Sequence, residues 1–407
     1  MKNFEIWWLS IGIILTSATQ MRLSSLPIGV GEVMLCIWML FSIVKILIVK
    51  QHLITPTLKY ICLFWMVGLA SLTFGLSIAD SRNLTSTTWY HDYFAFGFLF
   101  VFSICLTNSH FFYSQIHQML DYAVSFSILV LSTIFLFPSS ISFLTPWYEG
   151  VRFLGWSQNP NQLALLLSAV PFLSIHLFLT NSNVFARLKF LILIILCLII
   201  GIATQSDALI FAWMIGFTVT ILLNLYSWLN HKILSRRYIK SEIKVIWLLI
   251  IAVLLAIALL IFTEISYQGI YSASANVYDE GGQGSLRVTL WKNGLTAISA
   301  SPLFGLGPGA HSGSTAPFLD FEAHNTFIDW GSSSGILGII AYIAILGWIA
   351  WQVWNKQSFI LLSAIVALIV FSSFHYVLRH PIFWFYLLGI NSLTVQNHRS
   401  RYQISQN

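Results

Sequence analysis

Long apolar runs separated by short polar links dominate the pattern of this chain. The pattern predicts an all-α polytopic membrane protein, because most runs approach the ~20 residues that a helix needs to cross a bilayer. We expect about twelve transmembrane helices on that basis. No internal repeat or low-complexity linker interrupts the pattern, so residues 1–407 should form a single membrane domain. The runs lie at 6–18, 28–49, 58–79, 90–107, 119–138, 160–180, 188–204, 206–227, 243–263, 327–353, 358–377 and 380–396.

Composition excludes a soluble protein. Of the 407 residues, 57% are hydrophobic and 8% are charged, whereas soluble domains carry roughly 25% charged residues. The net charge of +6 would suggest a nucleic-acid partner in a soluble protein. Here the basic residues follow a membrane topology, so the expected partner is the lipid bilayer and no nucleic acid.

The basic residues also predict the orientation, since Lys and Arg accumulate in cytoplasmic loops. With a cytoplasmic N-terminus, both termini lie in the cytoplasm. One long outer segment, 264–325, then separates the ninth and tenth runs and forms a large periplasmic loop. Of the 20 basic residues, the outer side keeps only Arg22, Arg82, Arg152, Arg287, Lys292 and Arg379.

Part of the long outer segment should be helical, because a structureless loop of this length is unusual. Residues 285–300 place Arg287, Trp291, Leu295 and Ile298 along one helical stripe. Such a helix would lie in the membrane interface. Its first turn would hold Arg287 near the level of the lipid phosphates.

Four outer arginines, Arg22, Arg152, Arg287 and Arg379, are the first candidates for chemistry. Each one alone could simply reach outward to lipid headgroups. Four of them lie on the side that the charge rule disfavours. Because the planar guanidinium binds phosphate oxygens in a bidentate way, the group suits a lipid diphosphate.

His324 is the second candidate, where the long loop meets the tenth run. Thr326 and Asp329 have the spacing of a capping box, which predicts a helix start beside it. A neutral imidazole there could take a proton from an attacking hydroxyl, although a histidine merely packed at the interface remains the alternative. Asp320, Glu322 and His324 alternate in a loop, which is weak spacing for a metal site, and no metal is expected.

Two loop motifs complete the set. Asn159-Pro160-Asn161 begins the sixth run, where it could cap a helix or bond sugar hydroxyls. The glycine-rich stretch 301–310 lacks the GxGxxG spacing of a dinucleotide loop. Its glycines should make tight turns or let the backbone approach a ligand.

In combination, these elements resemble the O-antigen ligase and polymerase superfamily. The resemblance implies a metal-independent, inverting glycosyltransferase without a cofactor at the periplasmic face of the bacterial inner membrane. Its donor would be a glycan linked to undecaprenyl diphosphate, and its acceptor a second glycan or the lipid A core. The elements that match, in order, are Gly155 with Asn159-Pro160-Asn161, the stretch 301–307, and His324-Asn325 followed by Gly331, Gly335 and Gly338.

The resemblance also implies roles for individual residues. His324 would activate the acceptor, and Arg287 would act with it in catalysis by stabilising the diphosphate that leaves. Members of the family often carry a Ser-Arg pair where this chain has Ser206-Asp207, so the set of phosphate contacts differs here. The expected substrate-binding residues are Arg152, Arg287, Arg22, Arg379, Asn159, Asn161 and Asn325.

The acceptor stays open at the level of sequence. A polymerase, a ligase and a protein-glycosylating relative share the same elements, and we favour the polymerase. The alternative from another class is a transporter, since a bundle of this size with both ends inside is common among them. Transporters, however, hold their sites near the bilayer midplane. Here the ionisable residues gather at one face.

Overall fold

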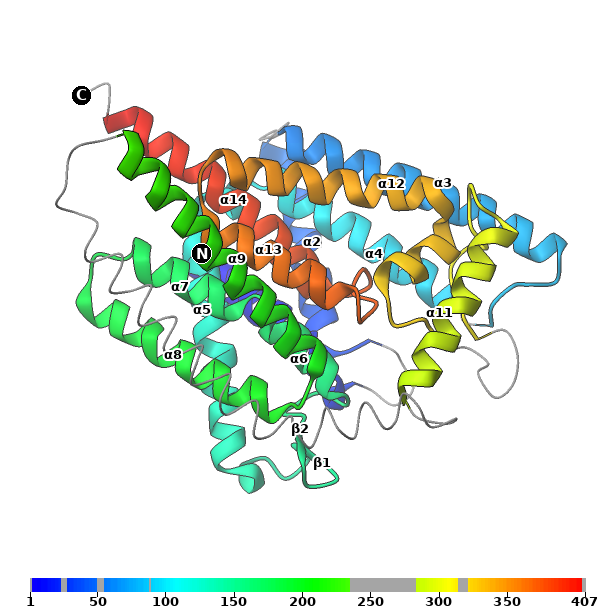
Figure 1. Ribbon diagram of the computed structural model, residues 1–407, viewed down its shortest axis with the longest axis horizontal. Helices are drawn as coiled ribbons and strands as arrows, with labels where there is room; N and C mark the ends of the chain where they lie inside the picture. The colour runs from blue at the N-terminus through cyan, green and yellow to red at the C-terminus, as the bar shows by residue number, and fades with distance from the viewer. Residues whose placement is uncertain are drawn as a thin grey trace.

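The protein is a helical bundle with one small hairpin, as seen in a computed structural model (Figure 1) that describes residues 2–22, 28–49, 55–87, 89–234, 283–313 and 321–404. The all-α membrane fold is confirmed. Strands β1 (Trp147–Tyr148) and β2 (Arg152–Phe153) pair antiparallel. The helices are α1 (Lys2–Leu15), α2 (Val30–Val49), α3 (Pro56–Ser81), α4 (Trp89–Asn108), α5 (His110–Leu136), α6 (Pro160–Ser168), α7 (Val170–Thr180), α8 (Val184–Ala203), α9 (Asp207–Leu234), α11 (Gln283–Ala300), α12 (Thr326–Asn355), α13 (Phe359–Ser372) and α14 (Pro381–Ile404).

The helices match the apolar runs. In the described residues, 8 segments are long and apolar enough to cross a membrane, and α1 and α13 are shorter apolar helices. The run at 243–263 lies outside the described residues. One prediction was wrong in detail: the run at 358–377 is not one helix, because α13 ends at Ser372 and 373–380 form a loop. That loop contributes to the site described below.

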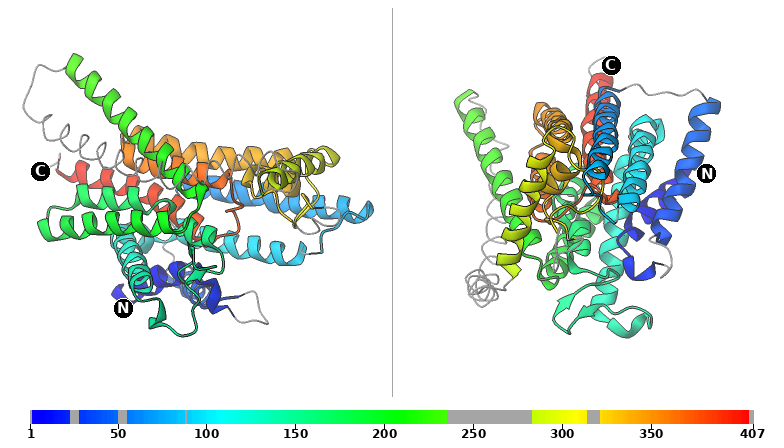
Figure 2. Two further views of the ribbon diagram at one scale, coloured as in Figure 1. Left: turned by 60° about the horizontal axis from the view of Figure 1, so that its bottom comes forward. Right: turned by 90° about the vertical axis from the view of Figure 1, so that its right-hand side faces the viewer.

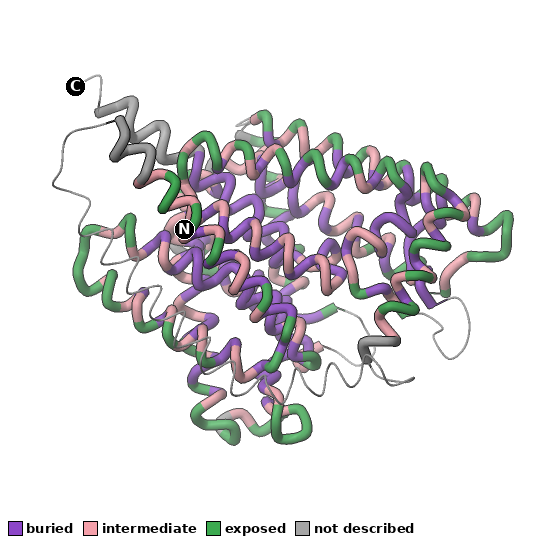
Figure 3. Tube along the Cα trace, viewed as in Figure 1, coloured by how far each residue is buried: buried purple, intermediate pink, exposed green. Residues whose placement is uncertain are grey.

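Burial separates central helices from peripheral ones. In the most apolar 18-residue window of the span formed by α6 and α7, 78% of the residues are buried inside the protein, whereas the share is 28% in α2 and in α8. Buried positions accordingly concentrate in the middle of the bundle (Figure 3). Large apolar side chains such as Leu40, Phe94 and Phe185 are exposed on the outside. An apolar surface of this kind is suited to lipid rather than water.

Helix α12 is broken, and a loop fills the break. Gly335 has φ +66°, which interrupts the helix after its first turns. The carbonyls of Ser332 and Ser333 accept hydrogen bonds from the backbone N–H groups of Leu306 and Gly307, at 2.8 and 3.0 Å. In the other direction, the N–H of Ile336 donates to the carbonyl of Pro302 at 2.8 Å. The backbone groups freed by the break are thus satisfied inside the bundle, as a membrane protein requires.

Glycines make this insertion possible. Gly305 and Gly307 both have positive φ, and a Cβ on Gly305 would overlap the backbone of Ser333. A Cβ on Gly307 would lie 2.6 Å from the backbone nitrogen of Leu76 in α3, which runs beside α12. The expected tight turns are therefore present. The partner that the glycines approach is the backbone of two helices.

Helix α11 confirms the helix expected at 285–300 and packs against α12. It lies at the end of the bundle that is opposite to the start of α1 and the end of α14 (Figures 1 and 2). Its most buried positions are Leu290 and Ala297, with Gly294 between them in contact distance of Ile328. Leu295, on the expected stripe, is 56% exposed. Tertiary packing has therefore selected a different face of the helix.

Candidate functional site

A polar pocket of about 210 Å³ lies where the beginning of α6, the first turns of α11, the loop before α12 and the loop 373–380 meet. It brings together five of the residues predicted from the sequence, namely Asn159, Asn161, Arg287, His324 and Arg379. Its lining residues are Asn159, Asn161, Gln162, Leu165, Arg287, Glu322, His324, Phe371, His375, Tyr376, Val377, Arg379 and His380.

His324 is held in a strained backbone conformation. Its φ is +52°, which is uncommon for a residue with a Cβ. The carboxylate of Asp329 accepts hydrogen bonds from the backbone N–H groups of both neighbours, Ala323 at 2.7 Å and Asn325 at 3.0 Å. The indole of Trp291 in α11 donates to the carbonyl of Ala323 at 2.9 Å. These contacts fix the residues on either side of His324, whose side chain lines the pocket.

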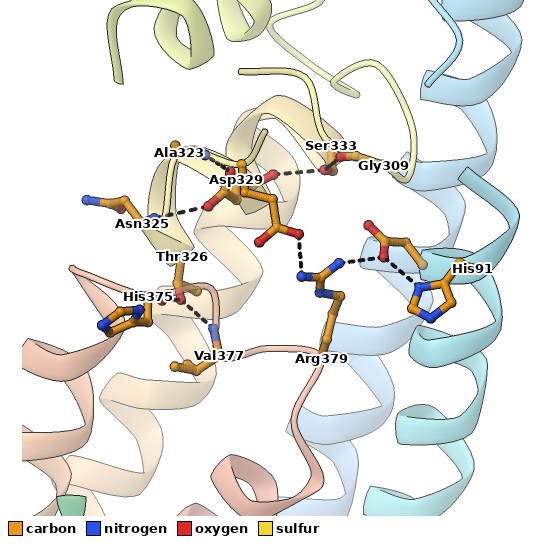
Figure 4. A network of polar contacts seen from close by, with 12 residues as sticks. His91, Gly309, Ala323, Asn325, Thr326, Asp329, Ser333, His375, Val377 and Arg379 are labelled. Atoms are coloured by element: carbon orange, nitrogen blue, oxygen red, sulfur yellow. Dashed lines mark hydrogen bonds and ion pairs between the residues drawn. The ribbon is translucent and has the colours of Figure 1, made fainter. Parts of the chain in front are cut away.

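The cap of α12 differs from the one predicted. Asn325, rather than Thr326, is the N-cap, and its side-chain oxygen accepts from the N–H groups of Phe327 and Ile328. Thr326 instead joins two loops. Its hydroxyl donates to the carbonyl of His375 at 2.7 Å and accepts from the N–H of Val377 at 3.0 Å. The loop 373–380 is thereby tied to the start of α12 (Figure 4).

Arg379 bridges two carboxylates (Figure 4). It donates to Asp92 in α4 at 2.7 Å and forms an ion pair with Glu322, two residues before His324. Its guanidinium also lies 4.9 Å from the ring centre of Tyr376. Burial opposes the charge of Arg379, but Glu322 and Asp92 outweigh burial and raise its pKa. In this structure the guanidinium of Arg379 is therefore already paired with two carboxylates, and its role as a phosphate ligand stays a prediction.

Arg287, in contrast, has no ion-pair partner among the described residues. It is half-buried at the pocket. Arg152 does not line the pocket, but it lies near enough to Arg287 for their charges to interact. Its guanidinium donates to the carbonyls of Thr204 and Gln205 at the end of α8, both at 3.2 Å. Burial lowers the pKa of Arg152, Asp207 opposes this, and Arg287 adds to it.

The other two predicted residues lie outside the pocket lining. Arg22 forms an ion pair with Glu32 at 2.7 Å. It lies near enough to His380 for their charges to interact. Asn325 uses its side-chain oxygen for the cap of α12. Asp320, considered above with Glu322 and His324 as a weak metal pattern, is not among the described residues.

The three histidines that line the pocket, His324, His375 and His380, favour the neutral form because burial lowers the pKa of each. Reduced hydration lowers the pKa of His324; Glu322 opposes this, and Arg287 and Arg379 reinforce it. Burial, with the charges of Arg287 and neighbouring groups, lowers the pKa of His375 to about 3. The centres of the two rings are 6.4 Å apart. A neutral imidazole can accept a proton, so His324 has the protonation state that a general base needs.

Sequence reasoning missed His375. The apolar run 358–377 placed this residue inside a helix, whereas it lies in the loop after α13 and stacks on Phe371 with 4.8 Å between ring centres. The polar residues Ser372 and Ser373 near the end of that run were the available signal that the helix ends early. Gln162 was also missed, although it follows directly on the Asn159-Pro160-Asn161 motif.

Comparison with known proteins gives a match over part of the chain. A family model described as O-Antigen ligase matches residues 191–343, a range that includes α11, the inserted loop and His324. No curated protein matches the chain. The match and the apolar helices together point to a multi-pass bacterial membrane protein of a type that transfers glycans. This match agrees with the resemblance to the O-antigen ligase and polymerase superfamily that was noted in the sequence.

Proposed function

We propose that the protein is an inverting glycosyltransferase that moves a glycan from undecaprenyl diphosphate to an acceptor hydroxyl at the periplasmic face of the inner membrane. The observation that carries the proposal is the pocket itself. It combines His324, which favours the neutral form, with Arg287, which has no ion-pair partner in the described part of the chain. A base and an uncompensated cation are the two groups that this reaction needs.

In the proposed reaction, His324 takes the proton of the acceptor hydroxyl while the oxygen attacks the anomeric carbon of the donor. The bond between that carbon and the diphosphate oxygen breaks, and the electron pair leaves with the diphosphate. Attack from the opposite side inverts the anomeric centre. Arg287, with Arg152 nearby, stabilises the negative charge that develops on the diphosphate. The proton passes from His324 to solvent or to the released diphosphate, and the reaction requires no metal.

The orientation belongs to this proposal. The pocket lies at the end of the bundle where α11 is found, and the start of α1 and the end of α14 lie at the other end (Figure 2). With both termini in the cytoplasm, the pocket faces the periplasm. A lipid diphosphate in the outer half of the bilayer would then reach it without crossing the membrane.

Transport gains no support from the broken helix. Transporters use discontinuous helices because their unwound backbone groups coordinate the substrate or the ion. In α12, the carbonyls of Ser332 and Ser333 already accept hydrogen bonds from Leu306 and Gly307. Those carbonyls are therefore used in hydrogen bonds within the protein and do not bind a transported substrate. We favour glycan transfer, with a polymerase ahead of a ligase as its form.

The test uses purified protein with an undecaprenyl-diphosphate-linked oligosaccharide as the sole substrate. A polymerase produces a ladder of longer lipid-linked glycans on a gel. Transfer that occurs only after lipid A core is added identifies a ligase. No transfer with either acceptor, under conditions in which the donor binds, would contradict the proposal.

A further inference from the structure

Three carboxamide side chains in the first turn of α6 line the pocket: Asn159, Asn161 and Gln162. Each of them uses its oxygen for a bond within the protein. The oxygen of Asn159 accepts from the backbone N–H of Asn161 at 2.8 Å. The oxygen of Asn161 accepts from the hydroxyl of Ser206 at 2.9 Å, and that of Gln162 accepts from the hydroxyl of Thr19 at 2.7 Å. The amide nitrogens have no partner among the described residues.

Chemistry fixes the orientation of Asn159, because a backbone N–H can only donate and the side-chain oxygen must therefore face Asn161. In Asn161 and Gln162, the oxygens are the atoms that face the hydroxyls of Ser206 and Thr19. The groups that these side chains offer to the pocket are therefore N–H donors.

The pocket contains a second group that lacks a partner. The Nε2 atom of His375 is buried and has no hydrogen-bond partner in the described part of the chain. A buried polar atom of this kind is costly unless a ligand or water completes it. Thr326 donates a hydrogen bond to the backbone carbonyl of His375, and the imidazole of His375 stacks on Phe371. These contacts restrict rotation of the imidazole toward another hydrogen-bond partner.

We propose that Asn159, Asn161 and Gln162 form a subsite for a group whose oxygen atoms accept hydrogen bonds but do not donate them. His375 completes the wall of this subsite. This inference rests on the proposed function and specifies how the donor is recognised. Carbonyl, carboxylate and phosphate oxygens fit, because each accepts hydrogen bonds and brings no proton of its own. A hydroxyl fits less well beside these three amides, because its proton would face N–H donors, and the carboxylate of Glu322 is already paired with Arg379.

Acid substitutions test the subsite with little change in shape. In Asn159→Asp, Asn161→Asp and Gln162→Glu, the retained oxygen keeps each internal bond, and the free N–H₂ becomes a carboxylate oxygen. Asp is as good an N-cap as Asn, so α6 should keep its stability. Asn183→Asp is the matched control, because Asn183 is the exposed N-cap of α8 and accepts from the N–H of Phe185 at 2.9 Å, away from the pocket.

Binding is measured with two probes in detergent: undecaprenyl diphosphate, and the same lipid carrying N-acetylglucosamine. Loss of a hydrogen bond to a charged or strongly polar oxygen, together with repulsion, should weaken binding by about tenfold or more. Asn183→Asp should bind like the wild type. Equal losses for both probes assign the subsite to phosphate oxygens. A loss for the glycan-bearing probe alone assigns it to the sugar carbonyl.

Unchanged affinity for both probes in all three variants would overturn the subsite. The proposed function fails differently, as a wild-type protein that binds the donor but transfers no glycan to either acceptor. In that case, weaker binding by the acid variants would still support the subsite.

Discussion

Replacement of Asp329 by Asn should slow glycan transfer by disturbing the backbone that presents His324. The native carboxylate accepts from Ala323 at 2.7 Å and from Asn325 at 3.0 Å. A buried hydrogen bond contributes about 0.5–1.5 kcal/mol net, and leaving its donor without a partner costs about 1–3 kcal/mol. The left-handed backbone of His324 costs roughly 1–3 kcal/mol in the opposite direction. Two such bonds roughly offset the strain, whereas one does not.

In Asp329→Asn, one oxygen remains and an N–H₂ group faces a backbone N–H. One bond is lost, and a buried donor is left without a partner. Because an unsatisfied buried donor costs about 1–3 kcal/mol, the population of the strained conformation of His324 should fall by roughly five- to hundredfold. We expect kcat to fall by a similar factor with little change in the KM for the donor, because Arg287 and the carboxamides are not altered.

The assay is the initial rate of transfer on the same gel system, with donor binding and thermal stability measured in parallel. Asp80→Asn serves as the control, since Asp80 is exposed near the end of α3. A variant of Asp329 with wild-type kcat would refute the argument that these two hydrogen bonds hold the base in place. A loss of donor binding equal to the loss of rate would point to a general collapse of the pocket instead.

Three further changes test other parts of the structure. His324→Ala should abolish transfer and keep donor binding, whereas His117→Ala, which affects a ring stacked on His176 inside the bundle, should be active. The pKa of His324 is lowered from 6.5, and the base acts in its neutral form. The wild-type rate should therefore decline only below that pH. Arg287→Lys should lower kcat by about tenfold or more, because an ammonium cannot reproduce the bidentate fork; full activity would mean that Arg287 only contacts headgroups. Gly305→Ala should destabilise the protein by more than about 1 kcal/mol, which would be measured as a lower Tm. Gly97→Ala should leave the Tm unchanged, because nothing lies within 4 Å of the added Cβ. An unchanged Tm for Gly305→Ala would contradict the tight insertion of its loop.

The features that sequence could predict are local ones. Apolar runs follow directly from the thickness of the bilayer, and the Asn159-Pro160-Asn161 cap follows from side-chain geometry within one turn. The helix at 285–300 follows from periodicity. His324 and Arg287 were singled out because polar residues are rare in this chain, and the structure brings both to one pocket.

The features that sequence could not predict depend on distant pairs. Asp92 and Glu322 neutralise Arg379, yet Asp92 is 287 positions from it in sequence. No local pattern marks that pairing. The break in α12 at Gly335 lies inside an apolar run, and its cause is a loop that precedes the helix. The face of α11 that is buried was likewise selected by α12, and not by the periodicity of α11 alone.

The insertion of the loop into α12 has a consequence for motion. Backbone hydrogen bonds hold the inserted loop on both sides of the break, from Leu306 to Ser332 and from Ile336 to Pro302. Opening of the loop would break these contacts together, so the amides of Leu306 and Ile336 should exchange with solvent as a single cooperative unit.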